Sequence, residues 1–110
     1  MPILHLVLVQ VKPDADAAEV QEACSRIMKL KDICLHPQTK LPYMRASFGG
    51  RDNSTEGLQH GMTHVFVEEF ETEEDRKYYL EKEPGHKEFV KSLGGLVEKV
   101  QVIDFIPGIF

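Results

Sequence analysis

The sequence has 110 residues, of which 13 are basic and 18 acidic, so the formal net charge at pH 7 is −5. This length predicts one domain, residues 1–110, and excludes an enzyme with separate cofactor and substrate domains. Nucleic acid is excluded as an expected partner, because no cluster of Lys and Arg offsets the negative charge. Hydrophobic residues make up 42% of the chain, which is typical of a folded globular protein.

The two cysteines, Cys24 and Cys34, are too few for a disulfide framework and match no metal-binding spacing. The apolar segment at residues 3–11 contains His5 and Gln10, is too short to span a bilayer and lacks the features of a signal peptide. The sequence therefore predicts a cytoplasmic protein with no membrane partner.

In the first half of the chain, residues 3–11 predict a strand with two apolar faces, which indicates cover on both sides. Asp16 is a suitable N-cap for an amphipathic helix over residues 17–33. A loop with two prolines follows, and residues 43–49 predict a second strand before a long polar connection.

In the second half, residues 62–71 alternate as a third strand. Thr72 is a suitable N-cap for a helix that reaches about residue 82, and Pro84 and Gly85 interrupt it. A short helix over residues 86–93 and a last strand over residues 96–106 complete the order. Six acidic residues lie between positions 68 and 75, around the start of the first of these helices, and Glu68 is one of them. We expect them to form a solvated turn that complements the helix dipole, and not a metal site.

This order predicts an α+β, ferredoxin-like βαββαβ domain, in which a four-stranded antiparallel sheet carries its helices on one face. The other face would then expose apolar side chains, the candidates being Leu4, Leu6, Leu8, Val65, Val67, Val100 and Val102. A monomer rarely exposes so large an apolar surface, so we expect a homodimer through this sheet face. The alternative is that sheet curvature and the C-terminal segment cover it.

Two histidines, His5 and His64, lie in the middle of strands that the predicted topology makes neighbours. We expect them to meet under the helices in a shared polar pocket, because a buried imidazole needs hydrogen-bond partners. The alternative is that each is an ordinary core histidine. His86 opens a short helix, whose dipole disfavours the imidazolium, and a neutral imidazole is a suitable general base. Tyr79, on the preceding helix, could polarise a carbonyl or pack as an amphipathic residue.

Several segments, in their order and spacing, resemble the stress-responsive A/B barrel (Dabb) family of the dimeric α/β-barrel superfamily. They are Leu4-His5-Leu6, residues 61–66, residues 69–79, residues 84–89 and residues 102–108. The resemblance implies a ferredoxin-like chain whose sheet pairs with that of a second copy. A cyclase of this family uses pocket histidines and a tyrosine that correspond to His5, His64, Tyr79 and His86.

The resemblance also implies a function, a cofactor-free and metal-free aldol cyclisation of a polyketide-like substrate. His86 would abstract an α-proton, Tyr79 would hold His86 or stabilise the enolate, and His5 and His64 would bind the substrate. One alternative is a non-enzymatic stress-responsive dimer that binds a small apolar molecule. A haem-utilising or monooxygenase relative of the same superfold is a further alternative, which rests on fold analogy.

Overall fold

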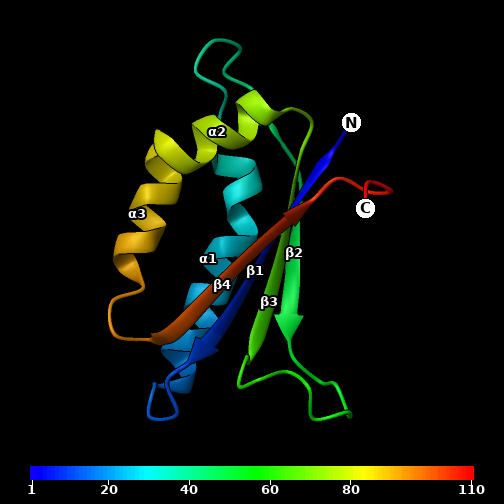
Figure 1. The fold of residues 1–110 in the computed structure, drawn as a ribbon. Coiled ribbons are helices and arrows are strands. Elements are labelled where there is room, and N and C mark those ends of the chain that lie inside the picture. Colours follow the sequence, from blue (N-terminus) through cyan, green and yellow to red (C-terminus); the bar gives the residue numbers. More distant parts are fainter.

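Seven elements follow one another in the computed structural model, which describes all 110 residues. They are β1 (Ile3–Val11), α1 (Ala17–Ile33), β2 (Met44–Arg51), β3 (His64–Phe70), α2 (Glu73–Glu81), α3 (Pro84–Ser92) and β4 (Val97–Phe105) (Figure 1). The predicted α+β, ferredoxin-like fold is confirmed, with the α2–α3 pair in the place of the second helix.

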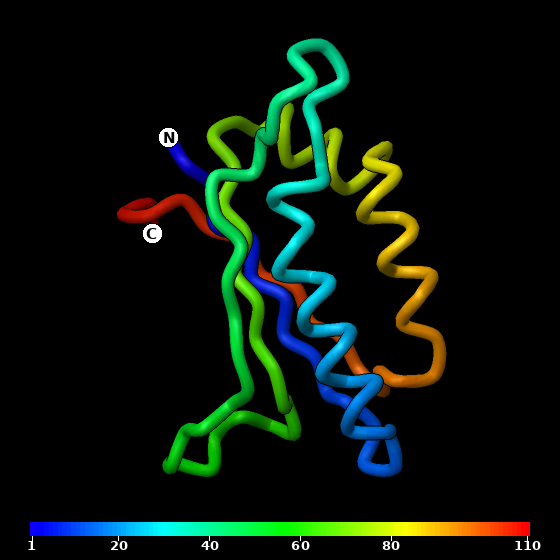
Figure 2. The backbone as a smooth tube through the Cα atoms, turned by 180° about the vertical axis from the view of Figure 1, so that it is seen from behind, coloured from blue at the N-terminus to red at the C-terminus, as the bar shows by residue number.

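The four strands form an antiparallel sheet in the order β2-β3-β1-β4, so that β1 lies in the interior. All three helices lie on one side of this sheet, as the views from the front and the back both show (Figures 1 and 2). This explains why the helix-facing side of β1 is apolar, because β1 is an interior strand that the helices cover on that side.

Helix starts follow the predicted capping chemistry. The Asp16 side chain accepts from the backbone N–H of Ala18 at 2.7 Å, and Thr72 Oγ1 accepts from the N–H of Asp75 at 3.1 Å. The third helix begins two residues earlier than predicted, because Pro84 occupies its first turn and Glu83 is its N-cap. Proline is favoured at a first helical position, where its missing N–H has no partner to lose.

The strand register places one polar residue from each strand in a single line across the sheet. Glu68 lies opposite both Ser47 and His5, and His5 lies opposite Asp104. Directly opposed residues of antiparallel strands point to the same face, and here that is the face covered by the helices. We call these four residues the polar row.

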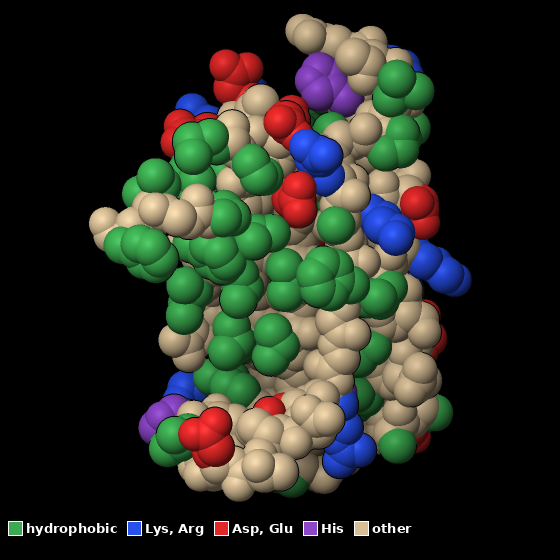
Figure 3. Space-filling model, turned by 90° about the vertical axis from the view of Figure 1, so that its right-hand side faces the viewer, with side chains coloured by type: hydrophobic (Ala, Val, Ile, Leu, Met, Phe, Trp, Pro, Cys, Tyr) green, Lys and Arg blue, Asp and Glu red, His purple; other side chains and the backbone are tan.

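The opposite face of the sheet carries a broad apolar surface (Figure 3). Its strand residues are Leu4, Leu6, Leu8, Phe48, Val65, Val67, Ile103 and Phe105. The C-terminal segment does not cover it, since the chain end extends away from the sheet (Figures 1 and 2) and Ile109 is 63% exposed. Val100 and Val102 were expected here, but they lie opposite Val9 and Val7 and face the helices instead.

No helix of the structure combines the length and the hydrophobicity needed to cross a bilayer.

Candidate active site

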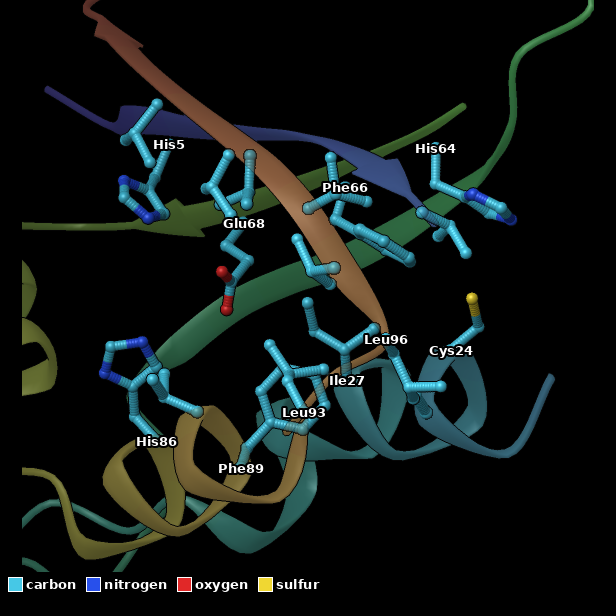
Figure 4. Close-up of a pocket in the computed structure, with 18 of the residues that line it drawn as sticks. His5, Cys24, Ile27, His64, Phe66, Glu68, His86, Phe89, Leu93 and Leu96 are labelled. Atoms are coloured by element: carbon cyan, nitrogen blue, oxygen red, sulfur yellow. The ribbon is translucent and has the colours of Figure 1, made fainter. Parts of the chain in front are cut away.

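A cavity of about 440 Å³ lies between the sheet and the helices (Figure 4). Apolar side chains from both layers make up most of its wall, and the polar groups are few. This volume and this composition are typical of sites for small organic molecules.

The cavity is long and its two ends differ in polarity. Alternate residues of β1 line it from His5 to Val11, a distance of about 20 Å at the usual rise of a strand. Polar side chains gather at one end, namely His5, Glu68, Tyr79, His86 and Asp104. The other end is lined mainly by Val11, Val20, Cys24, Leu96 and Val97. Figure 4 shows His5 and His86 at one end, with Cys24 and Leu96 at the other.

Four lining residues are far more exposed than the rest, and they mark the entrance. Leu80, Val90, Val100 and Val102 are between 43% and 53% exposed, although all four line the cavity. They come from α2, α3 and β4. The entrance is therefore apolar and lies between the helix pair and the edge strand.

The imidazole of His86 is held from one side at the polar end. Its Nδ1 donates a hydrogen bond to the backbone carbonyl of Tyr79 at 3.1 Å, and its ring stacks on the Tyr79 ring at 4.2 Å between centroids. Burial lowers the pKa of His86, while the Tyr79 carbonyl partly opposes that effect. The neutral ring therefore keeps Nε2 unprotonated, as a general base requires. Burial is the main cause here, and not the helix dipole on which the sequence argument relied.

The start of α3 is fixed by contacts that place His86. The Glu83 carboxylate accepts from the N–H of Gly85 at 3.2 Å and from the Tyr43 hydroxyl at 2.5 Å. A Cβ at Gly85 would come within 3.1 Å of Cys34 Sγ, so a larger residue would displace this turn from the end of α1. The position of His86 thus depends on close packing between the turn at Gly85 and the end of α1.

His5 and Asp104 form the start of a charge-linked chain. His5 Nδ1 donates to Oδ1 of Asp104 at 2.7 Å, and Arg76 donates to Oδ2 at 3.1 Å. The chain connects β1 and β4 to α2. Its carboxylate is fully engaged, because each oxygen has a donor. The sequence argument did not single out Asp104 or Arg76, although Asp104 interrupts an apolar alternation in the last strand.

Glu68 is the functional candidate that the sequence argument misjudged. It was expected in a solvated turn, but the residue is 1% exposed and its Oε2 has no hydrogen-bond partner. Burial raises the pKa of its carboxyl, and the Tyr79 hydroxyl and His5 partly offset the increase. Its position in the same alternation as His64 and Phe66 was the available signal, because that pattern assigns it to the helix-facing side.

Tyr79 connects the histidine and the carboxyl. It is 1% exposed, with its ring against His86 and its hydroxyl close enough to Glu68 to act on that pKa. Burial and the neighbouring carboxyl raise the pKa of Tyr79 well above its usual value, so the hydroxyl keeps its proton. It can donate a hydrogen bond, to Glu68 or to a bound oxygen.

His64 lines the same cavity but does not meet His5. In the register it lies opposite Val9, four residues along β1 from His5, which separates the two by about 13 Å. It donates to or accepts from Thr63 Oγ1 through Nδ1 at 2.9 Å, and burial lowers its pKa. The two histidines therefore line one cavity on the helix-facing side, as expected, but the expectation that they meet there is wrong. His64 lies at the far end, as Figure 4 shows.

The two cysteines have no role as nucleophiles in this geometry. Burial and the neighbouring Glu83 raise the pKa of Cys34 to about 12, and burial also raises that of Cys24. A protonated thiol is a weak nucleophile. No group of three or more His, Cys, Asp or Glu side chains is arranged to hold a metal ion.

Comparison with known proteins gives the family. The family described as the stress responsive A/B barrel domain (Dabb) matches residues 3–107. The chain belongs to this family. It is 31% identical over 106 residues to the stress-response A/B barrel domain-containing protein HS1 of Arabidopsis thaliana, covering 96% of this chain and 90% of that one. It is 24% identical to olivetolic acid cyclase of Cannabis sativa, covering 97% and 98%.

Solved structures of similar shape include an enzyme and a dimeric protein. The hydroxynitrile lyase of Passiflora edulis superposes with a TM-score of 0.83 at 21% identity, over 99% of this Dabb chain and 96% of that one. A ferredoxin-like protein from a Jannaschia species, described as dimeric, superposes with a TM-score of 0.75 at 16% identity, over 96% and 99%. Both likenesses support the fold.

Replacing Glu68 by Gln should stabilise the protein at alkaline pH. Because the pKa of this carboxyl is raised in the folded state, its contribution to stability is complete at low pH and is lost as the pH rises. Gln has no charge to bury at any pH. We expect Glu68→Gln to raise Tm at pH 8 by about 2–5 °C and to change it little at pH 4, measured by differential scanning fluorimetry.

The matched control is Glu69→Gln on the opposite face of β3, where the carboxylate pairs with Arg45 at the surface. It should give no gain in Tm at pH 8. An equal effect of Glu68→Gln at both pH values would contradict the assignment.

Proposed function

We propose that this Dabb protein is a cofactor-free acid–base enzyme of the polyketide cyclase or aldol type. The observation that carries the proposal is the state of His86. Its Nδ1 is occupied by the Tyr79 carbonyl, which leaves Nε2 as a base in a cavity with few polar groups. Proton abstraction next to a carbonyl needs such a base and no further group when the proton lies between two carbonyls.

In this mechanism, His86 Nε2 takes an α-proton from a poly-β-keto chain. The electrons of the broken C–H bond form a carbon–carbon double bond, and the carbonyl electron pair moves to oxygen to give an enolate. Donors at the polar end stabilise that oxygen, the Tyr79 hydroxyl among them. The enolate carbon then attacks a second carbonyl of the same chain, and the imidazolium returns the proton to the new alkoxide.

The form of the cavity supports a substrate with one polar and one apolar end. The carbonyl groups would lie near His86 and His5, and an alkyl or aryl tail would extend between the sheet and α1. His64 would contact the tail end of the molecule or a polar group carried there. Because the entrance is apolar, it favours a substrate whose apolar tail enters first. It would also suit a substrate that a carrier delivers to the site.

The relatives named above agree with this class of chemistry without fixing the substrate. One is a cyclase and another a hydroxynitrile lyase. Cleaving a hydroxynitrile to a carbonyl compound and cyanide also requires a base that takes a proton. At 24% and 21% identity these names support a type of reaction, and the substrate of this chain is inferred from its own cavity.

We further propose that two copies assemble through the apolar face of the sheet, as in a dimeric α/β barrel. The face is continuous over all four strands, and its residues Phe48, Ile103 and Phe105 are between 43% and 55% exposed in one chain. An apolar surface of this kind on a small domain is typical of a subunit interface. The dimeric description of a structural neighbour supports the same assembly.

Removing the base should abolish proton abstraction. The test substrate is nonane-2,4-dione, whose approach to keto–enol equilibrium in water is followed by ultraviolet absorbance. We expect the protein to accelerate this step and His86→Ala to lose about 100-fold of the acceleration, the usual contribution of a general base. The matched control is His60→Asn, an exposed loop position with positive φ that Asn tolerates.

Saturable binding of the dione without His86-dependent acceleration would contradict the proposal. That result would instead support a non-enzymatic dimer that binds a small ligand, consistent with the stress-response name of HS1.

The pH dependence of the same reaction gives a second test. Because burial lowers the pKa of His86, the base is unprotonated at a pH where an ordinary histidine would carry a proton. We expect the acid limb of kcat/KM, where protonation of the base lowers the rate, to lie below pH 6.5, the usual histidine value. An acid limb above pH 6.5 would show that another group, or an exposed histidine, is the base.

A charge in the apolar face should separate the two copies. Val67→Asp places a carboxylate at the centre of that face, which would be buried without a partner in the dimer. We expect the variant to elute as a folded monomer in size-exclusion chromatography with light scattering, with a circular dichroism spectrum like that of the unmodified protein. The control is Leu41→Asp in an exposed loop. A folded Val67→Asp protein of unchanged mass would exclude this interface.

A further inference from the structure

The Glu68 carboxyl has a position that neither the fold nor the proposed base explains. It stands on β3 between Phe66 and Phe70, both buried apolar residues on the same face. Its Oε2 has no hydrogen-bond partner, and it lines the cavity. Figure 4 shows the carboxyl extending from the sheet toward the helices, into the space that a ligand would occupy. An unpartnered buried oxygen is costly, and it indicates that a bound molecule supplies the partner.

The groups around Glu68 do not supply a cation for it. Asp104, from β4, engages both His5 and Arg76 with its own two oxygens. Tyr79 approaches from α2, and its hydroxyl acts on the carboxyl.

The other titratable groups near the carboxyl lie farther along the walls. The charge of Glu68 helps to raise the pKa of Cys34, at the end of α1, so this thiol is held protonated and carries no charge. His86 on α3 lines the same end of the cavity. From β2 the neighbour is Ser47, which has no charge and donates to the Ile27 carbonyl. The charge of His5, on β1, lowers the pKa of Glu68, but the Nδ1 of His5 is engaged by Asp104, so no cation hydrogen-bonds to the Glu68 carboxyl.

We propose that Glu68 binds the carbonyl oxygen of the substrate, donating a hydrogen bond from a protonated Oε2. The inference rests on the proposed function in one respect, because it takes the cavity to be the site of a carbonyl substrate. The polar end of the cavity would then select ligands that carry a neutral hydrogen-bond acceptor on an apolar chain.

The electrostatic surroundings favour the protonated carboxyl. Burial raises the pKa of Glu68, and the nearby Asp104 carboxylate adds to the increase. An apolar chain that fills the cavity displaces water and removes the solvation of any charge left there, so binding raises that pKa further. Ligand binding should therefore be linked to proton uptake.

This role complements that of His86 in the reaction. As His86 takes the α-proton, negative charge develops on the carbonyl oxygen, and a neutral carboxyl that already donates to this oxygen stabilises it more strongly. Glu68 would be a catalytic residue in contact with the reacting oxygen. Tyr79, with its hydroxyl near the carboxyl and its ring on His86, would keep the two groups in place.

The test measures binding of two probes that differ in one group, nonan-2-one and nonan-2-ol, by isothermal titration calorimetry at pH 5 and pH 8. The ketone can only accept a hydrogen bond, whereas the alcohol can also donate one to a carboxylate. We expect the ketone to bind about tenfold more weakly at pH 8 than at pH 5. In Glu68→Gln, whose amide donates at either pH, the ketone should bind with the same affinity at both.

Two further variants separate the hydrogen bond from effects of shape and charge. Glu68→Met keeps the length without a donor and should bind the ketone about tenfold more weakly than the unmodified protein at pH 5. Glu69→Gln, on the other face of the strand, should leave the affinity and its pH dependence unchanged. Titrations at pH 7 in two buffers of different ionisation enthalpy should show proton uptake with the unmodified protein and none with Glu68→Gln.

The proposal is overturned if ketone binding is independent of pH in the unmodified protein, or if Glu68→Gln keeps the full pH dependence. Tighter binding of the alcohol at pH 8 than at pH 5 would also overturn it, because the carboxylate would then be acting as an acceptor. Since these probes report binding alone, failure of this proposal leaves the His86-dependent reaction of the dione untouched. Loss of that reaction likewise leaves the binding result intact.

Discussion

The register of β1 against its two neighbours is the constraint on which the site depends. Side chains alternate along a strand, so a slip of one residue would turn His5 to the apolar face and bring Leu4 and Leu6 under the helices. The observed pairing places His5 between Glu68 and Asp104. Each polar group of the site therefore depends on this one pairing for its position.

The polar row divides into a satisfied part and an unsatisfied part. His5 and Asp104 of the row form a chain with Arg76 of α2 in which each carboxylate oxygen has a donor, so hydrogen bonds and charge offset the cost of burial. Glu68 has no such compensation at Oε2. A sheet that needed Glu68 for stability alone would gain more from an apolar side chain, which agrees with the proposed role of this carboxyl in binding.

Much of the fold follows from local chemistry in the sequence, and the site follows only in part. Helix α1 has the predicted bounds, because Asp16 caps it and its apolar spacing is regular. The family resemblance implied that Tyr79 and His86 lie together in one pocket, and their rings stack in the structure. The sequence argument failed for His64 because adjacency of strands does not give register. It failed for Glu68 because a charged residue near others was interpreted as surface, although its alternation with buried aromatic residues pointed inward.

The two ends of the cavity are lined by different residues, so in the proposed reaction the groups that act on the proton are separate from those that contact the tail. The base, the carboxyl and the charge-linked chain lie at one end, whereas Cys24, Leu96 and Val97 bound the other. Exchanging those distal residues for larger or smaller ones would alter the length of tail that fits, with no change in the groups that handle the proton. Under the proposed function, one set of acid–base groups on this small scaffold could thus serve several substrates, each selected by a few apolar residues far from the chemistry.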